Sequence, residues 1–173
     1  MDFNINKSLE ILEKTPEVIE KLLSELSPEW IVNNEGADSW SPYDIVGHLI
    51  HGEKTDWVQR TKIILSETGS KNFVPFDRFA QFTESQEKSL NDLVSEFKKI
   101  RSENLAYIRS LEINNDMLDK KAVHPSFGEV TLRQLLSAWT VHDLAHIAQI
   151  AGVMAKQYKA AVGPWIEYFR VLE

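Results

Sequence analysis

Apolar residues recur every three to four positions through four long stretches of the chain, a spacing typical of amphipathic helices. These stretches span residues 6–26, 43–65, 83–111 and 131–154. No segment between them shows the alternation of apolar and polar residues that marks a half-buried strand. The pattern therefore predicts an all-α protein, a four-helix bundle in which every apolar stripe faces one shared core.

Capping residues and one proline predict where these helices begin or are interrupted. Thr15 followed by Pro16 predicts that the first stretch is kinked or divided, with Thr15 as a cap for its second part. Thr83, with Gln86 three residues later, has the spacing of a capping box and predicts the start of the third helix. Thr131 is expected to cap the fourth helix.

The connections between the helices differ in character. Residues 29–39 are expected to form a polar loop, and residues 114–130 a long connection with a short turn inside it. After a Gly-Pro break, residues 165–172 predict a short C-terminal helix that packs back on the bundle. The whole chain, residues 1–173, is expected to form a single domain.

The connection over residues 68–78 and the segment that follows it are unusually aromatic. Four phenylalanines lie there, namely Phe73, Phe76, Phe79 and Phe82. These rings either close one end of the hydrophobic core or form a hydrophobic lip over a pocket, and the sequence leaves both interpretations open.

Composition narrows the classes of function. The 173 residues carry a formal charge of −7 without a cluster of Lys or Arg, so binding to nucleic acid is not expected. No stretch resembles a membrane span or a signal peptide, and we therefore expect a cytoplasmic protein that does not associate with membranes. The chain has no cysteine, so His, Asp or Glu side chains must hold any metal.

His142 and His146 interrupt the apolar stripe of the fourth helix one turn apart. This spacing directs both imidazoles to the same side of the helix. A metal ion is the simplest single partner for two buried rings, although either ring alone fits a core histidine bonded to a carbonyl or carboxylate. Asp143 replaces the Glu of a His-Glu-x-x-His motif, which argues against a metalloprotease, and it is expected to point away from the stripe.

Three other histidines are weaker candidates for metal ligands. His48 lies at the edge of the apolar side of the second helix and His51 lies further round, so His48 is favoured. An ordinary histidine at the boundary of the core is the alternative for His48. His124 lies in the connection before the fourth helix, where we expect it to be exposed unless that loop reaches a site.

Charged and polar residues elsewhere have simpler interpretations. The stretch that contains Arg101 is expected to form a solvated helix face, and Glu53 and Asp56 are expected to be surface acids. Asn104 lies on the apolar side of the third helix, where it either fixes the helix register or faces a polar site in the core.

Two polar residues lie one turn from candidate ligands. Asp44 is interpreted as a charge that stabilises the start of the second helix, with a hydrogen bond to His48 as the alternative. Gln149, which follows His146 by three residues, either flanks the site or faces solvent.

Four segments, taken in order, resemble the DinB-like family of four-helix metalloenzymes, to which YfiT-type proteins are related. They are WSPYDIVGH (40–48), HPSFGEVT (124–131), TVHDLAHIAQI (140–150) and GPW (163–165) with Tyr168. The resemblance covers nearly the whole chain and implies the bundle fold described above. Carried over residue by residue, it implies a metal triad of His48, His142 and His146 and no such role for His51.

Three neutral imidazoles leave at least one coordination position open, as in catalytic zinc sites. Zn²⁺ is the first expectation, and Ni²⁺ and Fe²⁺ also suit nitrogen ligands. A water bound there would ionise near neutral pH and attack a substrate, which predicts a hydrolase. A bound thiol would lose its proton instead, and the resemblance implies S-transferases that use low-molecular-weight thiols such as bacillithiol or mycothiol.

These observations predict a metal-dependent enzyme that acts on a small molecule, either a thiol S-transferase or a hydrolase. The alternative is a noncatalytic bundle that binds a metal or a partner. The resemblance and the spare aromatic surface also predict a homodimer, with Trp30, Phe73 and Trp165 as candidates for the interface.

Overall fold

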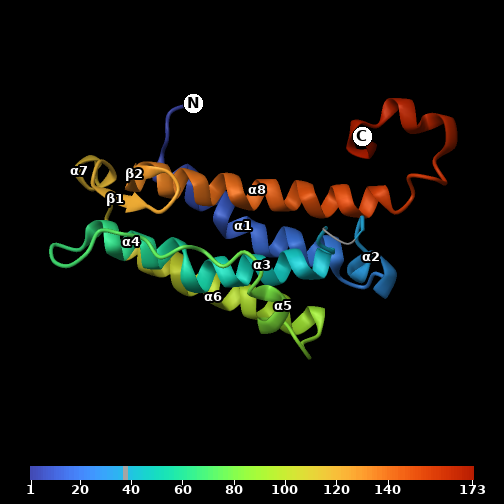
Figure 1. The fold of residues 1–173 in the computed structure, drawn as a ribbon, viewed down its shortest axis with the longest axis horizontal. Helices are drawn as coiled ribbons and strands as arrows, with labels where there is room; N and C mark the ends of the chain where they lie inside the picture. The colour runs from blue at the N-terminus through green and yellow to red at the C-terminus, as the bar shows by residue number, and fades with distance from the viewer. Residues whose placement is uncertain (37–38) are drawn as a thin grey trace.

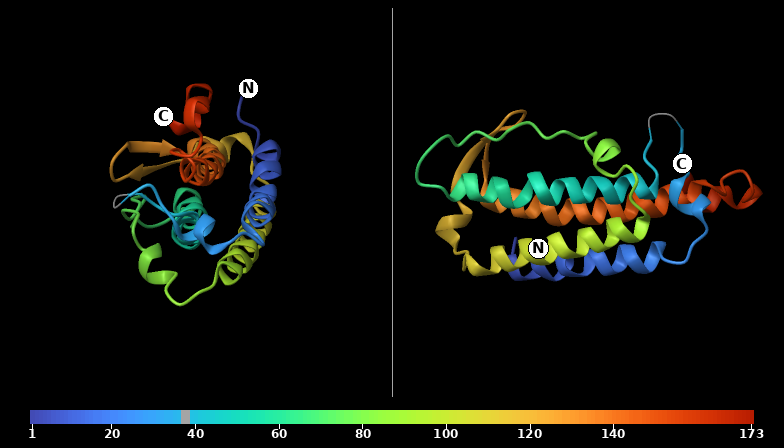
Figure 2. Two further views of the ribbon diagram at one scale, coloured as in Figure 1. Left: turned by 90° about the vertical axis from the view of Figure 1, so that its right-hand side faces the viewer. Right: turned by 90° about the horizontal axis from the view of Figure 1, so that it is seen from below.

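A computed structural model describes residues 1–36 and 39–173 and shows four long helical segments packed as a bundle (Figure 1). They are α1 (Ile5–Leu23), α3 (Pro42–Thr55) with α4 (Trp57–Leu65), α6 (Leu90–Ser110) and α8 (Leu132–Lys156). Helices α1 and α3 each contact both α6 and α8, so successive helices α1 and α3 lie on a diagonal of the bundle (Figure 2). The prediction of a helical four-helix bundle is confirmed, and long connections join the diagonal neighbours.

Short elements lie within these connections and after α8. They are α2 (Pro28–Val32), α5 (Gln81–Glu84), α7 (Asn115–Leu118), β1 (Lys121–His124), β2 (Gly128–Thr131), and the 3₁₀ turns η1 (Gly163–Tyr168) and η2 (Arg170–Leu172). The predicted polar loop over residues 29–39 therefore begins as a helix, and its residues 37–38 lie outside the described part. The predicted C-terminal helix consists of the two 3₁₀ turns, and Leu172 is buried against the bundle.

The antiparallel hairpin β1–β2 was not predicted. Its strands pair from Lys121 opposite Thr131 to His124 opposite Gly128. A three-residue turn joins them, and Gly128 supplies the positive φ of 72° that this type of hairpin requires. The strands are four residues long and bury little more than Ala122. The sequence therefore shows no alternation of apolar and polar residues from which these strands could be predicted.

Helix α6 begins at Leu90, so the predicted start at Thr83 is wrong. The Ser89 hydroxyl accepts the Asp92 N–H, and the Asp92 carboxylate accepts the Ser89 N–H, which completes a capping box. Residues 81–84 form the separate helix α5 instead. The second helix is also interrupted, because the backbone of Asp56, with φ −109° and ψ −77°, departs from regular helical geometry between α3 and α4.

Helix α1 continues through Pro16, so the predicted division of this helix is wrong. Thr15 is not an N-cap, and its hydroxyl donates to the carbonyl oxygen of Ile11 at 3.1 Å. A proline has no N–H for the carbonyl four residues earlier, which here belongs to Leu12. The Arg101 guanidinium from α6 donates to that oxygen at 2.6 Å and replaces the missing hydrogen bond.

The hydrophobic core consists of two clusters that follow each other along the bundle. One gathers Leu12, Leu105 and Trp139 with their neighbours, and the other gathers Ile19, Phe97 and Ile150 with theirs. On each of α1, α6 and α8, a short polar interval separates the two clusters. These intervals meet at Arg101, which is 2 % exposed.

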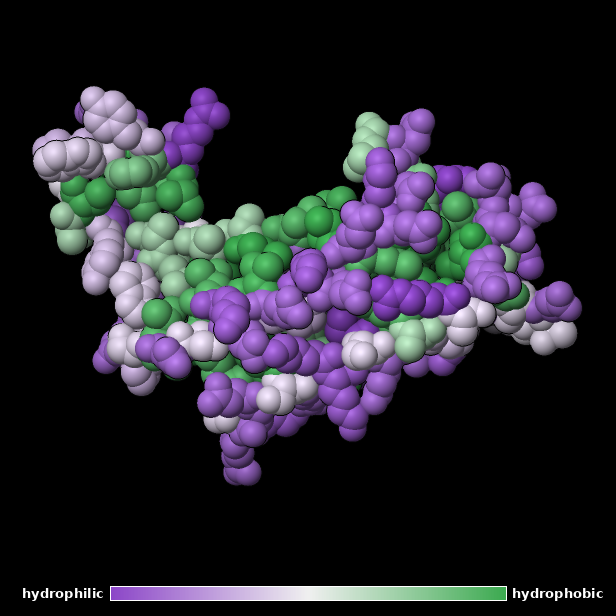
Figure 3. All heavy atoms as spheres, turned by 180° about the vertical axis from the view of Figure 1, so that it is seen from behind, coloured by the Kyte–Doolittle hydropathy of each residue, from purple (hydrophilic) through white to green (hydrophobic). Residues whose placement is uncertain are grey.

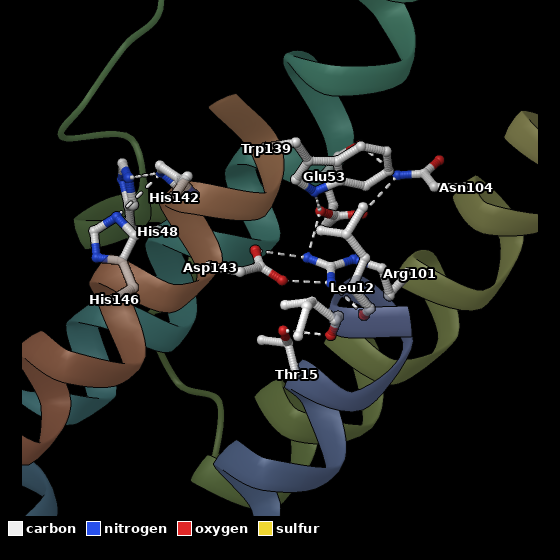
Figure 4. Close-up of polar contacts among 11 residues, drawn as sticks. Leu12, Thr15, His48, Glu53, Arg101, Asn104, Trp139, His142, Asp143 and His146 are labelled. Atoms are coloured by element: carbon white, nitrogen blue, oxygen red, sulfur yellow. Dashed lines mark hydrogen bonds and ion pairs between the residues drawn. The ribbon is translucent and has the colours of Figure 1, made fainter. Parts of the chain in front are cut away.

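Arg101 forms a buried ion cluster with Glu53 and Asp143 (Figure 4). Its two terminal nitrogens donate to the two Asp143 oxygens at 2.6 and 3.0 Å, and one also donates to Glu53 at 2.9 Å. Glu53 further accepts hydrogen bonds from the Trp139 indole and the Asn104 amide. Asn104 therefore faces a polar site in the core. The expectation that Arg101 and Glu53 are solvated, and that Asp143 points away from the core, is wrong.

The charge of Arg101 is stable in this interior position. Burial opposes the charged form, but the neighbouring Glu53 and Asp143 outweigh burial, so the pKa of Arg101 lies above its usual value. The rings of Phe97 and Trp139 cover the guanidinium at 4.9 and 5.3 Å. One cation and two carboxylates, all hydrogen-bonded, thus replace apolar packing at the middle of the bundle.

Replacing Arg101 should destabilise the fold strongly. Arg101→Met leaves the Glu53 and Asp143 carboxylates buried without a cation, which should lower the free energy of unfolding by about 3–5 kcal/mol. Arg109→Met is the matched control, because Arg109 pairs with Glu13 at 3.1 Å on the surface and such pairs contribute about 0–1 kcal/mol. Urea unfolding followed by circular dichroism measures both, and similar losses in the two variants would contradict the role of the cluster.

Candidate metal centre

Three imidazoles from two helices converge on one point beside the bundle core (Figure 4). Helix α3 supplies His48, and α8 supplies His142 and His146. The Nε2 atom of His142 lies 3.2 Å from that of His48 and 3.1 Å from that of His146. The structure therefore brings together the three histidines that the sequence singled out, with one nitrogen of each within 4.8 Å of the others.

One hydrogen bond defines the tautomer of His146. The side-chain oxygen of Gln149 lies 2.8 Å from Nδ1 of His146, so this nitrogen carries the proton and Nε2 presents its lone pair to the cluster. Gln149 thus flanks the site. Nδ1 of His48 and Nδ1 of His142 are buried without a hydrogen-bond partner within the part of the chain that the structure describes.

Burial keeps the three rings neutral. It lowers the pKa of His48 to about 3 and that of His142 to about 2, and the nearby His146 adds to both shifts. Burial also lowers the pKa of His146, although the hydrogen bond to Gln149 opposes this change. Near neutral pH the cluster therefore offers nitrogen lone pairs.

The spacing of these nitrogens suits a metal of the size of zinc. Zn–N bonds of about 2.0–2.1 Å in a tetrahedron place neighbouring nitrogens about 3.3–3.4 Å apart. The two Nε2 separations of 3.2 and 3.1 Å are close to that value. The donor set, three neutral imidazoles, is one that Zn²⁺, Ni²⁺ and Fe²⁺ all accept.

Aromatic rings surround the cluster on several sides. Trp40 lies 4.7 Å from His48 and 6.4 Å from His146 between ring centroids, and the edge of Phe76 meets His48 at 5.4 Å. Trp57 contacts His142 at 5.1 Å. These rings limit the access of water to the imidazoles, which strengthens electrostatic interactions inside the site.

The four phenylalanines of the aromatic segment have different positions. Phe73 is 5 % exposed and packs in the core, as expected for a ring that closes one end of it. Phe76 lines the pocket described below, as expected for a hydrophobic lip. Phe79 and Phe82 stack on each other at 6.4 Å and remain largely exposed.

The cluster lies in a pocket of about 980 Å³. One wall is the segment with Phe76 and Arg78, and another is the tip of the hairpin with His124 and Phe127. The two walls are joined, because the Phe73 N–H donates to the carbonyl oxygen of Val123 at 2.9 Å. His124 is half-buried and stacks on Phe127 at 4.4 Å, so its loop does reach the site.

An ion pair that the sequence analysis did not identify also lines the pocket. Asp56 and Arg60 are 7 % and 8 % exposed and pair one helical turn apart. The expectation that Asp56 is a surface acid is therefore wrong. Burial raises the pKa of Asp56 to about 6, although Arg60 opposes this shift. The sequence does hold one feature that predicts this ion pair, namely the spacing of four residues between Asp56 and Arg60, which places them one helical turn apart.

Two candidates from the sequence lie outside the donor set. His51 is buried, but its Nδ1 lies 3.0 Å from a carboxylate oxygen of Glu84. Asp44 accepts hydrogen bonds from the N–H and hydroxyl of Ser41, which makes it the third residue of the capping box at the start of α3 and leaves it without a bond to His48. Neither residue contributes a nitrogen or oxygen to the cluster of three histidines.

Acid should destabilise the metal-free protein through these histidines. The pKa values of His48 and His142 fall from 6.5 to about 3 and about 2 on folding, so protons bind the unfolded chain first. Stability should therefore decline as the pH falls from about 6.5 towards 3. The melting temperature of EDTA-treated protein between pH 7.5 and 4.5 measures the effect. His142→Gln should show a shallower decline, and an equal slope would contradict the assignment.

Known proteins resemble this chain in sequence and in structure. The model of the DinB superfamily matches residues 11–150. YfiT from Bacillus subtilis, described as a probable metal-dependent hydrolase with an unusual four-helix bundle topology, has a similar structure with a TM-score of 0.74. The match covers 88 % of this chain and 87 % of YfiT at 16 % identity, which shows a shared fold. No curated protein matches the sequence significantly.

Among the described residues, no helix is both long enough and hydrophobic enough to cross a lipid bilayer.

Proposed function

The chain belongs to the DinB superfamily, and we propose that it is a metal-dependent hydrolase whose metal is bound by His48, His142 and His146. The observation that carries the proposal is the convergence of three neutral Nε2 atoms at the wall of an open pocket. Three protein ligands leave a position for water or substrate, whereas a structural zinc site is normally closed by four. Zinc is the first candidate, and nickel and iron are the alternatives.

When bound, the metal would supply a Lewis acid that activates water near neutral pH. The chain's own residues would prepare the site for this chemistry. Gln149 holds the tautomer of His146, and Trp40, Trp57 and Phe76 keep bulk water away from the imidazoles. The Asp56–Arg60 pair and Arg78 provide polar contacts for a small-molecule substrate in the same pocket.

Thiol S-transfer is the second candidate for the reaction. The volume of 980 Å³ lies at the upper end of the range for small-molecule pockets, so it has room for a thiol and an acceptor together. The chain has no cysteine, so the thiol would be a low-molecular-weight compound such as bacillithiol. The open pocket beside the donor set favours either enzyme over the noncatalytic bundle.

Metal content tests the proposed ligands. Elemental analysis of untagged protein should find about one metal per chain, and His146→Ala should lose it while the helical content is kept. His124→Ala is the matched control, because His124 lines the same pocket without belonging to the donor set, and it should retain the metal. Stoichiometric metal in His146→Ala, or none in the wild type after soaking with zinc and nickel, would overturn the proposal.

Activity assays on zinc-loaded protein separate the two reactions. A panel of small amides, esters and alkyl halides should be tested with and without bacillithiol, with His48→Ala as the metal-site variant. Product formation without thiol, lost in His48→Ala, supports the hydrolase. Product formation only with thiol supports S-transfer, and an inactive protein with full metal content supports the noncatalytic alternative.

A further inference from the structure

The pocket extends well beyond the three histidines. Along α3 and α4, four residues at a spacing of four line it, namely His48, Gly52, Asp56 and Arg60. This spacing places them on one side of the two helices, which follow each other along nearly one line (Figure 2). At 1.5 Å per residue, Arg60 lies about 18 Å along the helices from His48. The pocket is therefore a groove that leads from the candidate metal centre to the Asp56–Arg60 pair.

Gly52 keeps this groove open between its two ends. A glycine in the middle of a helix is destabilising relative to alanine, so its position calls for a reason. A Cβ atom at residue 52 would lie 3.3 Å from Nε1 of Trp57. Trp57 is 6 % exposed, and its indole N–H has no hydrogen-bond partner among the described residues. A buried indole N–H usually has a partner, so this part of the groove fits an acceptor atom of a ligand.

The guanidinium of Arg60 has terminal nitrogens to spare. Asp56 pairs with Nε of Arg60 and thereby fixes the orientation of the side chain. Of the terminal nitrogens, Nη2 donates to the carbonyl oxygen of Val74 at a long 3.4 Å, and Nη1 has no partner in the part of the chain that the structure describes. Two terminal nitrogens of an arginine match the two oxygens of a carboxylate.

His124 presents a further hydrogen-bond donor at the same end of the groove. The Ser126 N–H donates to Nδ1 of His124 at 3.1 Å, so the proton of this imidazole is on Nε2. Burial and the positive charge of Arg60 lower the pKa of His124, which keeps the ring neutral at pH 7. We term Asp56, Arg60 and His124 the distal subsite.

Arg60 and His124 meet at the ring of Phe73. The guanidinium carbon of Arg60 lies 4.9 Å from the centre of this ring, and His124 meets it edge-on at 6.1 Å between centroids. Because Phe73 is buried here, the suggestion that it belongs to a homodimer interface is wrong.

The strand that carries His124 is fixed to the end of α4. The Val123 N–H donates to the carbonyl oxygen of Lys71 at 2.8 Å. The ammonium group of Lys71 in turn donates to the last carbonyl oxygens of α4, those of Ile63 at 3.1 Å and Ile64 at 2.6 Å. The distal subsite is therefore preorganised, because both of its donors are held by the same helix.

We propose that the distal subsite binds the carboxylate group of an elongated small-molecule substrate whose other end reaches the metal. The reaction at the metal rests on the function proposed above, whereas the binding of the carboxylate does not. Phe76 and Phe127 line the groove with apolar rings, which suit a hydrocarbon chain between two polar ends.

The charge of the groove fits a single negative charge. Its charged lining residues are Glu35, Asp56, Arg60 and Arg78. Asp56 offsets Arg60, and Lys156 pairs with Glu35 at 3.0 Å. Among the described residues, Arg78 is thus the one lining charge without a counterion. A carboxylate matches this charge better than a phosphate group, which carries close to two negative charges near pH 7.

Octanoate tests the distal subsite in EDTA-treated protein, without a metal. It should shift the imidazole NMR signals of His124 in a saturable way. Arg60→Met should weaken binding by about 10–100-fold, and Arg60→Lys, which keeps the charge beside Asp56 but lacks the planar fork, by at least about tenfold. Arg133→Met is the matched control, because Arg133 pairs with Asp119 at 3.0 Å outside the groove.

Three results would overturn the proposal. They are an absence of saturable binding, an unchanged affinity in both Arg60 variants, and an equal affinity for octanamide, which lacks the negative charge. Inorganic phosphate that binds more tightly than octanoate would assign the subsite to phosphate groups instead.

The other apolar surface of the molecule requires its own control, because octanoate is hydrophobic. Figure 3 shows hydrophobic residues along the hollowed edge between the C-terminal turns and the N-terminus. Val141 is 63 % exposed on α8 and does not line the groove. Val141→Glu should therefore leave octanoate binding unchanged, and a loss of binding in this variant would contradict the assignment to the groove.

A ligand with two polar ends tests whether the groove connects the two sites. Suberic acid monohydroxamate carries a metal-binding hydroxamate and a carboxylate at opposite ends, and octanohydroxamic acid lacks the carboxylate. Zinc-loaded protein should bind the first at least about tenfold more tightly in calorimetric titrations. Gly52→Leu should remove this difference and retain both the metal and the affinity for acetohydroxamate. Equal affinities in the wild type would overturn the connection.

The two proposals fail in different ways. Protein that binds octanoate but no metal retains the distal subsite and loses the proposed function. Protein that binds zinc and acetohydroxamate but not octanoate retains the metal centre and loses the distal subsite.

Discussion

The guanidinium of Arg101 connects all four long helices of this bundle. It extends from α6 to the Leu12 carbonyl on α1, to Glu53 on α3 and to Asp143 on α8. Apolar stripes alone allow helices to slide or rotate at small cost, because one buried leucine packs nearly as well as the next. A buried cation with two buried carboxylates does not allow this, because any shift leaves a charge without its partner. We therefore regard this cluster as the constraint that sets the register of the helices.

The candidate metal centre depends on the same constraint. Asp143 and His142 are neighbours on α8, and successive residues of a helix differ in direction by about 100°. Holding Asp143 towards Arg101 therefore turns His142 towards the pocket (Figure 4). On α3, Glu53 holds the helix five residues after His48. The separation of 3.2 Å between the nitrogens of His48 and His142 thus follows from how α3 and α8 are anchored in the interior.

Helix α8 is more apolar than a surface helix normally is, because its sides have different surroundings. One side carries Leu136, Asp143 and Ile150 into the core, a second presents His142 and His146 to the pocket, and a third exposes Val141 and Leu144. A helix at the edge of a bundle normally leaves this third side polar. The core and the candidate site therefore share one helix, which also exposes apolar side chains on its third side.

The sequence by itself determined the helical bundle, the cap at Thr131 and the pairing of His142 with His146, because each is encoded by spacing along a single helix. Only the tertiary structure decided which charges are buried. Glu53 and Asp143 lie 48 and 42 residues from Arg101 in the sequence, and each of the three residues alone is typical of an exposed position because its partners are on other helices. The same holds for the distance from His48 to His142 and for the hairpin that lines the pocket, since contacts between segments decide both.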